Sequence, residues 1–298
     1  MTDVAARSGH ETEHPTPPTS GRSLDDVPWI ENRSLSSWFP RLDLRELWAS
    51  RDVTRALALR NIKSRYKQTL LGVAWTVLQP LSAVVIFTLV FGRLAEVPSD
   101  GIPYPVFVYA GLAVWLYVSG AANLASESLA QYRELVTKVY FPRLHAPLAA
   151  VLPGLIDLGI SLVAVAAFMA FYGVAPTAAL VTLPLWIVAA VLLALAVGIW
   201  LAALNVRYRD VRNVLAFALQ LWLFVTPVLY ASSLLEGKWT WVLALNPLAG
   251  LVVGFRWALV GTDAPGVWAL GSLAIGLSVL VSGIVYFARV QRRFADLI

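Results

Sequence analysis

The sequence predicts an all-α integral membrane protein, and three observations lead to that fold class. The chain has 298 residues, of which 58% are hydrophobic and 14% are charged. This balance is too apolar for a soluble domain to cover, so lipid must solvate most of the chain. Long stretches contain no Asp, Glu, Lys or Arg, and the basic residues lie mainly between those stretches. The absence of cysteine excludes disulfide frameworks and thiolate nucleophiles.

Six transmembrane helices are predicted from the lengths of the apolar stretches. A bilayer core of about 30 Å needs roughly 20 apolar residues of helix. The stretch 158–206 is long enough for two helices and contains a Gly-Val-Ala-Pro turn at 173–176, so it is divided there. The spans are predicted near residues 70–92, 104–124, 146–171, 178–204, 213–231 and 266–288.

A further apolar run, 239–255, is too short for an ordinary span. It is interrupted by Asn246 and Pro247, and proline removes a helix hydrogen bond. We therefore predict a re-entrant outer hairpin between spans five and six, within residues 236–262, as an outer gate that includes Arg256.

The distribution of basic residues sets the orientation, because Lys and Arg favour the cytoplasmic side. With six spans, every Lys and Arg except Arg93, Lys238 and Arg256 falls on a cytoplasmic segment. A seventh span would place the basic C-terminal residues outside. Both termini are therefore expected in the cytoplasm, and nucleic acid is not an expected partner, because the basic residues are dispersed among apolar stretches.

The N-terminal part divides into two predicted regions. Residues 1–35 are rich in Thr, Pro, Ser and acids, contain no apolar core for a signal peptide, and are expected to form a disordered cytoplasmic tail. Residues 36–69 alternate apolar and basic side chains at about helical spacing, which predicts an amphipathic helix along the cytoplasmic face. Residues 70–298 then form the transmembrane domain.

Basic residues at the end of the amphipathic helix have two interpretations. They could anchor the chain to anionic lipid headgroups, as in any polytopic protein. They could instead bind a cytoplasmic partner and the phosphates of a lipid-linked substrate. The residues concerned are Arg60, Lys63, Arg65 and Lys67.

The loop between spans two and three, residues 127–143, combines both charge signs with aromatic side chains. A docking surface for another protein and an ordinary amphipathic connector both fit this composition. The residues that would form the docking surface are Glu134, Lys138, Tyr140, Phe141 and Arg143.

Asp157 is the one acidic residue placed deep in a predicted span, where a charge costs roughly 2.5 to 3.5 kcal/mol. It could line a substrate path, form a structural hydrogen bond to another helix, or lie near the wet interface. The 12 Trp and 10 Tyr residues fit aromatic belts at the two interfaces, and a minority could stack on sugar rings.

The sequence contains few residues that indicate an enzyme. There are three histidines, two of them in the N-terminal tail, so no histidine cluster for a metal site is expected. The sequence has no Gly-x-x-x-x-Gly-Lys-Ser/Thr phosphate loop and no Gly-x-Ser-x-Gly elbow. The chain is therefore not expected to hydrolyse ATP itself.

Several short motifs, read in order from about residue 40 to the C-terminus, resemble the membrane permease of the polysaccharide-export branch of type-2 ABC transporters. The matching segments are Asn-Ile-Lys-Ser-Arg-Tyr-Lys-Gln-Thr-Leu-Leu-Gly at 61–72, Leu-Gln-Pro at 78–80, residues 87–93, Pro-Tyr-Pro at 103–105, Lys-Val-Tyr-Phe-Pro-Arg at 138–143, residues 204–212, Thr-Pro-Val-Leu-Tyr at 226–230 and Asn-Pro-Leu at 246–248.

This resemblance implies a homodimer of six-helix permeases in the bacterial inner membrane, with a channel along the dimer axis. Two cytoplasmic ABC ATPase subunits would bind ATP and Mg²⁺, leaving no cofactor in this chain. The family's interface helix would match residues 40–67, its coupling segment 127–143, and its outer gate 236–262. The implied substrate is a glycan or polyol-phosphate polymer on a polyprenyl diphosphate, as in O-antigen, teichoic acid or galactan export.

Two alternatives from other functional classes stay open at this point. One is an exporter of the same fold that moves a drug or a small lipid. The other is a membrane-embedded glycosyl or phosphoryl transferase, which would need an acid pair or metal site that the sequence does not offer.

Overall fold

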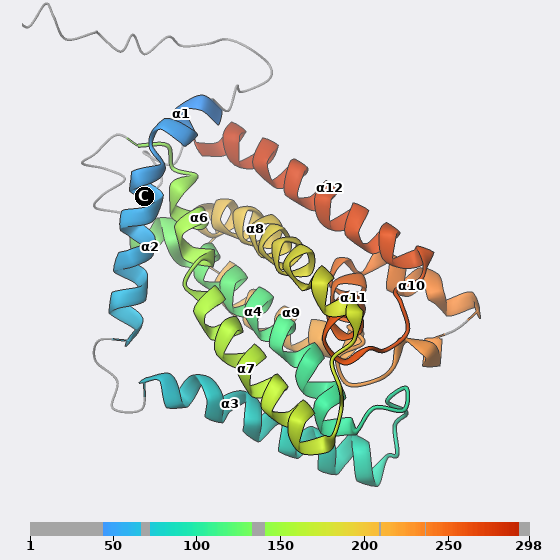
Figure 1. Ribbon diagram of the computed structural model, residues 1–298. Coiled ribbons are helices and arrows are strands. Elements are labelled where there is room, and N and C mark those ends of the chain that lie inside the picture. Colours follow the sequence, from blue (N-terminus) through green and yellow to red (C-terminus); the bar gives the residue numbers. More distant parts are fainter. Residues whose placement is uncertain (1–43, 67–71, 133–140, 209, 236, 292–298) are drawn as a thin grey trace, which may run out of the picture. The chain divides into compact units, whose positions relative to one another are not determined.

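The computed structural model describes residues 44–66, 72–132, 141–208, 210–235 and 237–291, all within the compact unit Phe39–Ile298. Every regular element in these ranges is helical (Figure 1). The predicted tail 1–35 and the start of the predicted interface helix 36–69 lie outside the described residues. The elements are α1 (Leu44–Ala49), α2 (Arg51–Tyr66), α3 (Gly72–Phe87) continued by the π-helix η2 (Thr88–Leu94), α4 (Tyr104–Gln131), α6 (His145–Val151), α7 (Gly154–Tyr172), η3 (Ala178–Thr182), α8 (Leu183–Arg207), α9 (Val211–Val225), η4 (Ser232–Leu235), η5 (Gly237–Trp239), α10 (Thr240–Leu245), α11 (Pro247–Val260) and α12 (Val267–Val290).

Helix α4 is the centre of the helix bundle. It packs against α6, α7, α8 and α11, and most of its residues are buried. Small side chains allow the close approach: a Cβ atom on Gly198 of α8 would lie 2.5 Å from the Cβ of Ala125 on α4. Small residues at helix contacts are the usual way in which membrane helices pack, because lipid offers no hydrophobic drive between helices.

Five helical segments are long and apolar enough to cross a membrane among the described residues. They are Ala74–Leu94, Tyr104–Gln131, His145–Tyr172, Ala178–Arg207 and Val267–Val290. These segments agree with five of the six predicted spans, so the prediction of an all-α membrane protein is confirmed.

The predicted span 213–231 differs from the other five. Its helix, α9, ends at Val225 after 15 residues, which is about 22 Å of helix at 1.5 Å per residue. The helix stops because Thr226 is extended and Pro227 follows it. Helix α9 is therefore shorter than the bilayer core, and a sixth crossing remains a prediction.

The predicted interruption of the apolar run 239–255 is confirmed at Asn246. Helix α10 ends there and α11 begins at Pro247, which suits the first helical position because proline lacks the N–H group that would be unpaired there. The Asn246 side chain caps α11 by accepting a hydrogen bond from the Leu248 N–H at 3.1 Å. How deeply this helix pair enters a membrane remains a prediction.

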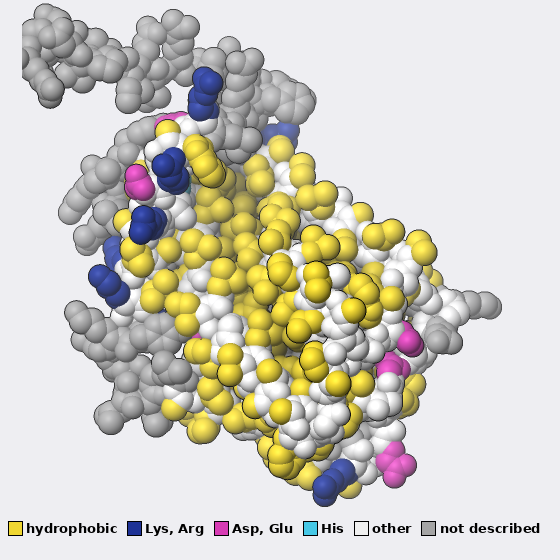
Figure 2. Space-filling view, viewed as in Figure 1, with side chains coloured by type: hydrophobic (Ala, Val, Ile, Leu, Met, Phe, Trp, Pro, Cys, Tyr) yellow, Lys and Arg dark blue, Asp and Glu magenta, His cyan; other side chains and the backbone are white. Residues whose placement is uncertain are grey.

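Helix α2 lies at one end of the bundle and runs across the direction of α4, α7 and α8 (Figure 1). It packs against α6. Most of the Lys and Arg side chains in view are gathered over α1 and α2 at this end, together with a few acidic ones (Figure 2). The excess of basic side chains over α1 and α2 agrees with the orientation predicted from the sequence, in which α2 is on the cytoplasmic side.

Candidate functional site

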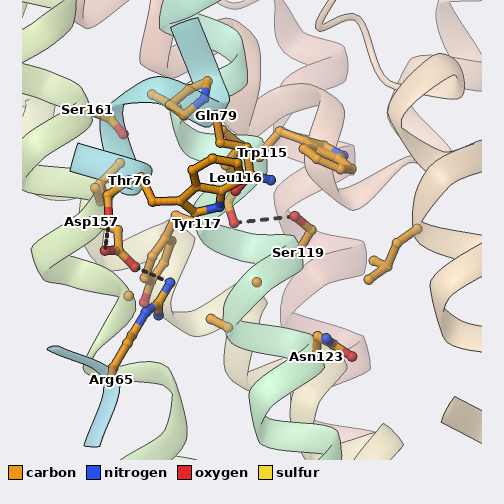
Figure 3. Close-up of a pocket in the computed structure, with 18 residues that line it drawn as sticks. Arg65, Thr76, Gln79, Trp115, Leu116, Tyr117, Ser119, Asn123, Asp157 and Ser161 are labelled. Atoms are coloured by element: carbon orange, nitrogen blue, oxygen red, sulfur yellow. Dashed lines mark hydrogen bonds and ion pairs between the residues drawn. The ribbon is translucent and has the colours of Figure 1, made fainter. Parts of the chain in front are cut away.

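A cavity of about 770 Å³ lies between α3, α4 and α7, and Leu219 of α9 also lines it. Polar and aromatic side chains line much of this space although the surrounding helices are apolar (Figure 3). The labelled lining residues are Arg65, Thr76, Gln79, Trp115, Leu116, Tyr117, Ser119, Asn123, Asp157 and Ser161. The cavity therefore places hydrogen-bonding side chains beside three segments that can span the membrane.

The charged group of this cavity is an ion pair between helices α2 and α7. The Arg65 guanidinium lies 2.7 Å from the Asp157 carboxylate, and the Thr76 hydroxyl of α3 donates a hydrogen bond to the same carboxylate at 3.3 Å. The Arg65 side chain is 43% exposed and that of Asp157 is 17% exposed. The pair thus joins three helices while its arginine remains open to the cavity.

The helix that carries Asp157 begins later than the sequence suggests. The predicted span 146–171 is broken at residues 152–153, so α7 begins at Gly154 and Asp157 lies in its first turn. The positive end of the helix dipole favours a carboxylate there. The carboxylate is also paired with Arg65 of α2, which offsets part of the cost of its charge.

Ser119 and Asn123 carry the polar lining of α4, and the sequence analysis did not single them out. They are spaced four residues apart and therefore share one face of the helix. Gln79 of α3 also lines the cavity. A search for polar residues at helical spacing inside the apolar stretches would have found the first two.

Three aromatic residues contribute to the cavity wall. Trp75 of α3 is largely exposed, Trp115 is half-buried, and Tyr117 is buried with its hydroxyl donating to the Val151 carbonyl at 3.4 Å. Among the described residues, the Trp115 indole N–H is buried and has no hydrogen-bond partner. Aromatic faces next to hydroxyl and amide groups are the kind of surface that can contact sugar rings.

The other predicted basic residues lie near this end of α2. Arg60 is exposed and its guanidinium is 5.0 Å from the ring of Tyr132, at the end of α4. Burial raises the pKa of Tyr132, whereas its hydrogen bond to Asn61 and the nearby Arg60 act in the opposite direction. Lys63 is exposed, and Lys67 lies outside the described residues. Of the three described members of this group, only Arg65 lines the cavity.

The predicted docking loop is only partly described. Glu134, Lys138 and Tyr140 lie outside the described residues. Phe141 packs against the hydrophobic core, and the Arg143 guanidinium donates a hydrogen bond to the Gln291 carbonyl at the end of α12. The C-terminal end of the loop is therefore fixed to the bundle.

Asn246 of the predicted outer gate is the centre of a buried hydrogen-bond network. Its side-chain oxygen accepts from the Trp222 indole N–H at 2.9 Å, and its amide nitrogen donates to the Thr226 hydroxyl at 3.0 Å. The Ser272 hydroxyl donates to its main-chain carbonyl at 2.6 Å. Asn246 therefore links the end of α9 to α11 and α12.

Arg256 is 2% exposed and also holds the segment that follows α9. Its guanidinium donates to the carbonyls of Pro227 at 2.6 Å and of Val228, and to that of Phe107 at 3.1 Å. The Phe107 ring lies 3.6 Å from its Cζ atom. The sequence predicted Arg256 as a gate residue but gave no indication of these acceptors, because they are main-chain atoms of distant segments.

The comparisons with known proteins are consistent with one another. Residues 52–260 match a family model described as ABC-2 type transporter. A protein of Myxococcus xanthus named O-antigen export system permease protein RfbA is 31% identical over 259 residues, which cover 85% of this chain and 98% of that protein. Two Klebsiella pneumoniae proteins of the same name are 26% and 25% identical, each over 83% of this chain and 95% of their own length.

Proposed function

The chain belongs to the ABC-2 type transporter family and is a transport subunit rather than an enzyme; from that premise we propose that it forms the channel of an ATP-driven exporter of lipid-linked polysaccharide. A permease of this family works with an ABC ATPase. We place ATP and Mg²⁺ in that partner, and the polymer on a polyprenyl diphosphate lipid. The membrane is the bacterial inner membrane, with both termini in the cytoplasm.

The cavity between α3, α4 and α7 is the observation that carries this proposal. A polysaccharide needs a path that is wet, rich in hydrogen-bonding groups and bordered by flat apolar surfaces. The cavity combines Ser119 and Asn123 with Trp75 and Trp115, which meets these requirements inside a set of otherwise apolar helices. Asp157 is the channel-lining residue predicted from the sequence, and its position at the cavity supports that role.

The lipid diphosphate would enter at the end of α2. Arg60, Lys63 and Arg65 are exposed in the last two turns of this helix, and Lys67 continues the series in the sequence. A diphosphate is a strong anion, and arginine binds such oxyanions through two parallel hydrogen bonds. Arg65 joins this basic group to the cavity, so the substrate could pass from one to the other.

A second copy of the chain would complete the channel. Helices α3 and α9 expose large apolar side chains, among them Leu78, Ile86, Val214 and Phe217. The cavity opens between these helices, because Trp75 and Leu219 both line it. Contact between the α3 and α9 faces of two copies would cover these apolar side chains and enclose the cavities around a common axis, with α9 supplying the proposed sixth span.

The two ends of the channel have different proposed roles. Residues 134–143 would dock on the ATPase and transmit its movement to the bundle through Arg143 and the end of α12. At the outer end, the helix pair around Asn246 and Pro247 would re-enter the membrane and form the gate, which Arg256 keeps attached to the end of α9.

Removal of the gene from its bacterium is the direct test of this proposal. Without the permease, the surface polysaccharide should disappear and its lipid-linked precursor should accumulate in the cytoplasm, as measured by gel electrophoresis of surface glycans and mass spectrometry of extracted lipids. Complementation with the wild-type chain should restore export. Unchanged surface glycans would contradict the proposal and favour a drug or small-lipid substrate for the same fold.

Purification of the chain with its associated proteins supplies the second measurement. Recovery of an ABC ATPase and of two permease copies per complex is expected. A monomeric permease with ATPase bound would contradict the paired channel but leave the substrate class open.

A further inference from the structure

A second hollow lies away from the cavity described above, between the α1–α2 pair and α6. This α2–α6 groove has a volume of about 620 Å³ and is open along one side. One part of its lining is apolar, formed by Leu47, Ala58, Leu59, Ile62, Leu148 and Leu152. The other part carries the polar and aromatic groups Trp48, Arg51, Thr54, Arg55 and His145.

The polarity of the groove changes along α2. Arg51 and Arg55 lie in the first turns of the helix, whereas Leu59 and Ile62 follow toward its C-terminal end. At 1.5 Å per residue, Arg51 and Ile62 are separated by about 16 Å along the axis. The groove is therefore cationic at one end and apolar at the other. These two ends complement the anionic headgroup and the acyl chain of a phospholipid.

The polar end of the groove is held in place by buried contacts. His145 is 1% exposed, and its ring is hydrogen-bonded to the hydroxyls of Ser50, at 2.8 Å, and Thr54. The Arg51 guanidinium lies 5.6 Å from the ring of Trp48. Among the described residues, no carboxylate forms an ion pair with Arg51 or Arg55. Both arginine side chains are exposed.

We propose that the α2–α6 groove binds one anionic phospholipid of the cytoplasmic leaflet. The phosphate lies between Arg51 and Arg55, and an acyl chain follows Ala58, Leu59 and Ile62 along α2. Charge complementarity favours this occupant, because the groove belongs to the end of the chain where basic side chains gather (Figure 2) and the cytoplasmic leaflet carries anionic lipids. Trp48, which is 72% exposed, is a residue type that prefers the membrane interface.

A protein helix fits the groove less well than a lipid chain. A helix with its side chains is about 10–12 Å wide, so a volume of 620 Å³ would hold only about 1 to 1.5 turns of it. An acyl chain is narrower and needs no hydrogen-bond partners. The proposal depends on membership of a membrane permease family but not on the identity of the exported substrate.

The test measures lipid retention by the purified full-length chain. Native mass spectrometry would count bound phosphatidylglycerol after titration in detergent, with phosphatidylcholine of identical acyl chains as the zwitterionic comparison. We expect one phosphatidylglycerol to be retained per chain at concentrations where phosphatidylcholine is not. Glycerol 3-phosphate, added as a soluble source of the same headgroup chemistry, should not displace it at equal concentration, because it lacks the acyl chain.

The variant Arg51→Glu/Arg55→Glu should weaken phosphatidylglycerol binding at least about 25-fold, since each basic residue near an anionic lipid contributes a factor of roughly five. Arg207→Glu/Arg289→Glu changes the net charge equally at exposed positions outside the groove and should bind normally. Arg51→Lys/Arg55→Lys should retain most of the binding, which separates loss of charge from loss of fold. Equal weakening in both glutamate variants, or equal retention of the two lipids by the wild type, would overturn the proposal.

Discussion

Two arginines at opposite ends of the bundle show different ways of placing a cation in a membrane protein. Arg256 is buried and satisfied by main-chain carbonyls after α9, whereas Arg65 is 43% exposed and pairs with one carboxylate beside a cavity. Carbonyls fixed in a folded segment cannot leave Arg256 without local unfolding. The exposed side of Arg65 faces the cavity, as the proposed substrate path requires, whereas the buried Arg256 suits a structural role.

Removal of the Arg256 side chain should have the largest effect on stability. Arg256→Ala leaves buried carbonyls of Pro227, Val228 and Phe107 without donors, and each unpaired buried group costs about 1–3 kcal/mol. We expect a loss of at least about 3 kcal/mol in the free energy of unfolding, measured by denaturant titration in detergent. A variant as stable as the wild type would show that the segment after α9 is held by other contacts.

Gly111→Ala should weaken the hydrogen bonds of Arg256 to these carbonyls, with a smaller loss of stability. The added Cβ would lie 2.6 Å from the Nη2 atom of Arg256, so the guanidinium must shift from its carbonyls. A loss of about 1–3 kcal/mol is expected from such overpacking. Gly120→Ala on the same helix has no atom within 4 Å of the added carbon and is the matched control, which should be neutral or slightly stabilising.

The Arg65–Asp157 ion pair should contribute little to stability but should be needed for export. Asp157→Asn should lower the free energy of unfolding by no more than about 1 kcal/mol, because ion pairs open to solvent contribute little. Export of surface polysaccharide should nevertheless fall, since the variant loses the charge that positions Arg65 at the cavity.

The exchange variant Arg65→Asp/Asp157→Arg separates the presence of the ion pair from the position of its cation. It restores an ion pair between α2 and α7 but moves the cation away from the basic end of α2. We expect wild-type stability with export still reduced. Full recovery of export would mean that the pair serves only to hold the two helices together, as Arg256 does at the other end.

The smallest change in stability is expected for the polar face of α4. Ser119→Val and Asn123→Leu each replace a polar group that lines the cavity. Because Asn123 is exposed, Asn123→Leu should change the free energy of unfolding by about 0.5 kcal/mol or less. The rate of export should fall if these groups hydrogen-bond the moving polymer. Leu124→Gln, a change at an exposed neighbour that does not line the cavity, serves as the comparison for export.

Much of the helical architecture could be predicted because lipid imposes a simple rule on the sequence. A helix that crosses the bilayer must be long and largely uncharged, so the spans through α4 and α12 are readable from the positions of charged residues. The spans through α7 and α8 also need the Gly-Val-Ala-Pro turn at 173–176, which divides one uncharged stretch into two helices. The rule fails at α9, where the apolar stretch 213–235 continues beyond the helix end at Val225. Hydrophobicity sets how long the uncharged stretch is, but Pro227 sets where the helix stops.

The site residues divide in the same way. Arg65 and Asp157 were both predicted as functional from their charge, yet no pattern in the sequence joined them, because they are far apart along the chain and meet only when α2 lies across the start of α7. The α2–α6 groove was likewise hidden, since Leu148 and Leu152 of its wall belong to a predicted span and are distant in sequence from α2. The proposed lipid site uses Arg51 and Arg55, which neither interpretation of the basic residues at the end of α2 had named.

The membrane environment, the helical spans, the expected orientation and the family motifs could all be read from the amino-acid sequence, because each of them depends on local composition. The surroundings of the two arginines, a cavity for Arg65 and main-chain carbonyls for Arg256, became visible in the folded chain alone. Ion pairs, carbonyl acceptors and grooves arise between segments that are distant along the chain, and whether a cation is buried against main-chain oxygens or left beside a cavity depends on helix packing rather than on its neighbours in sequence.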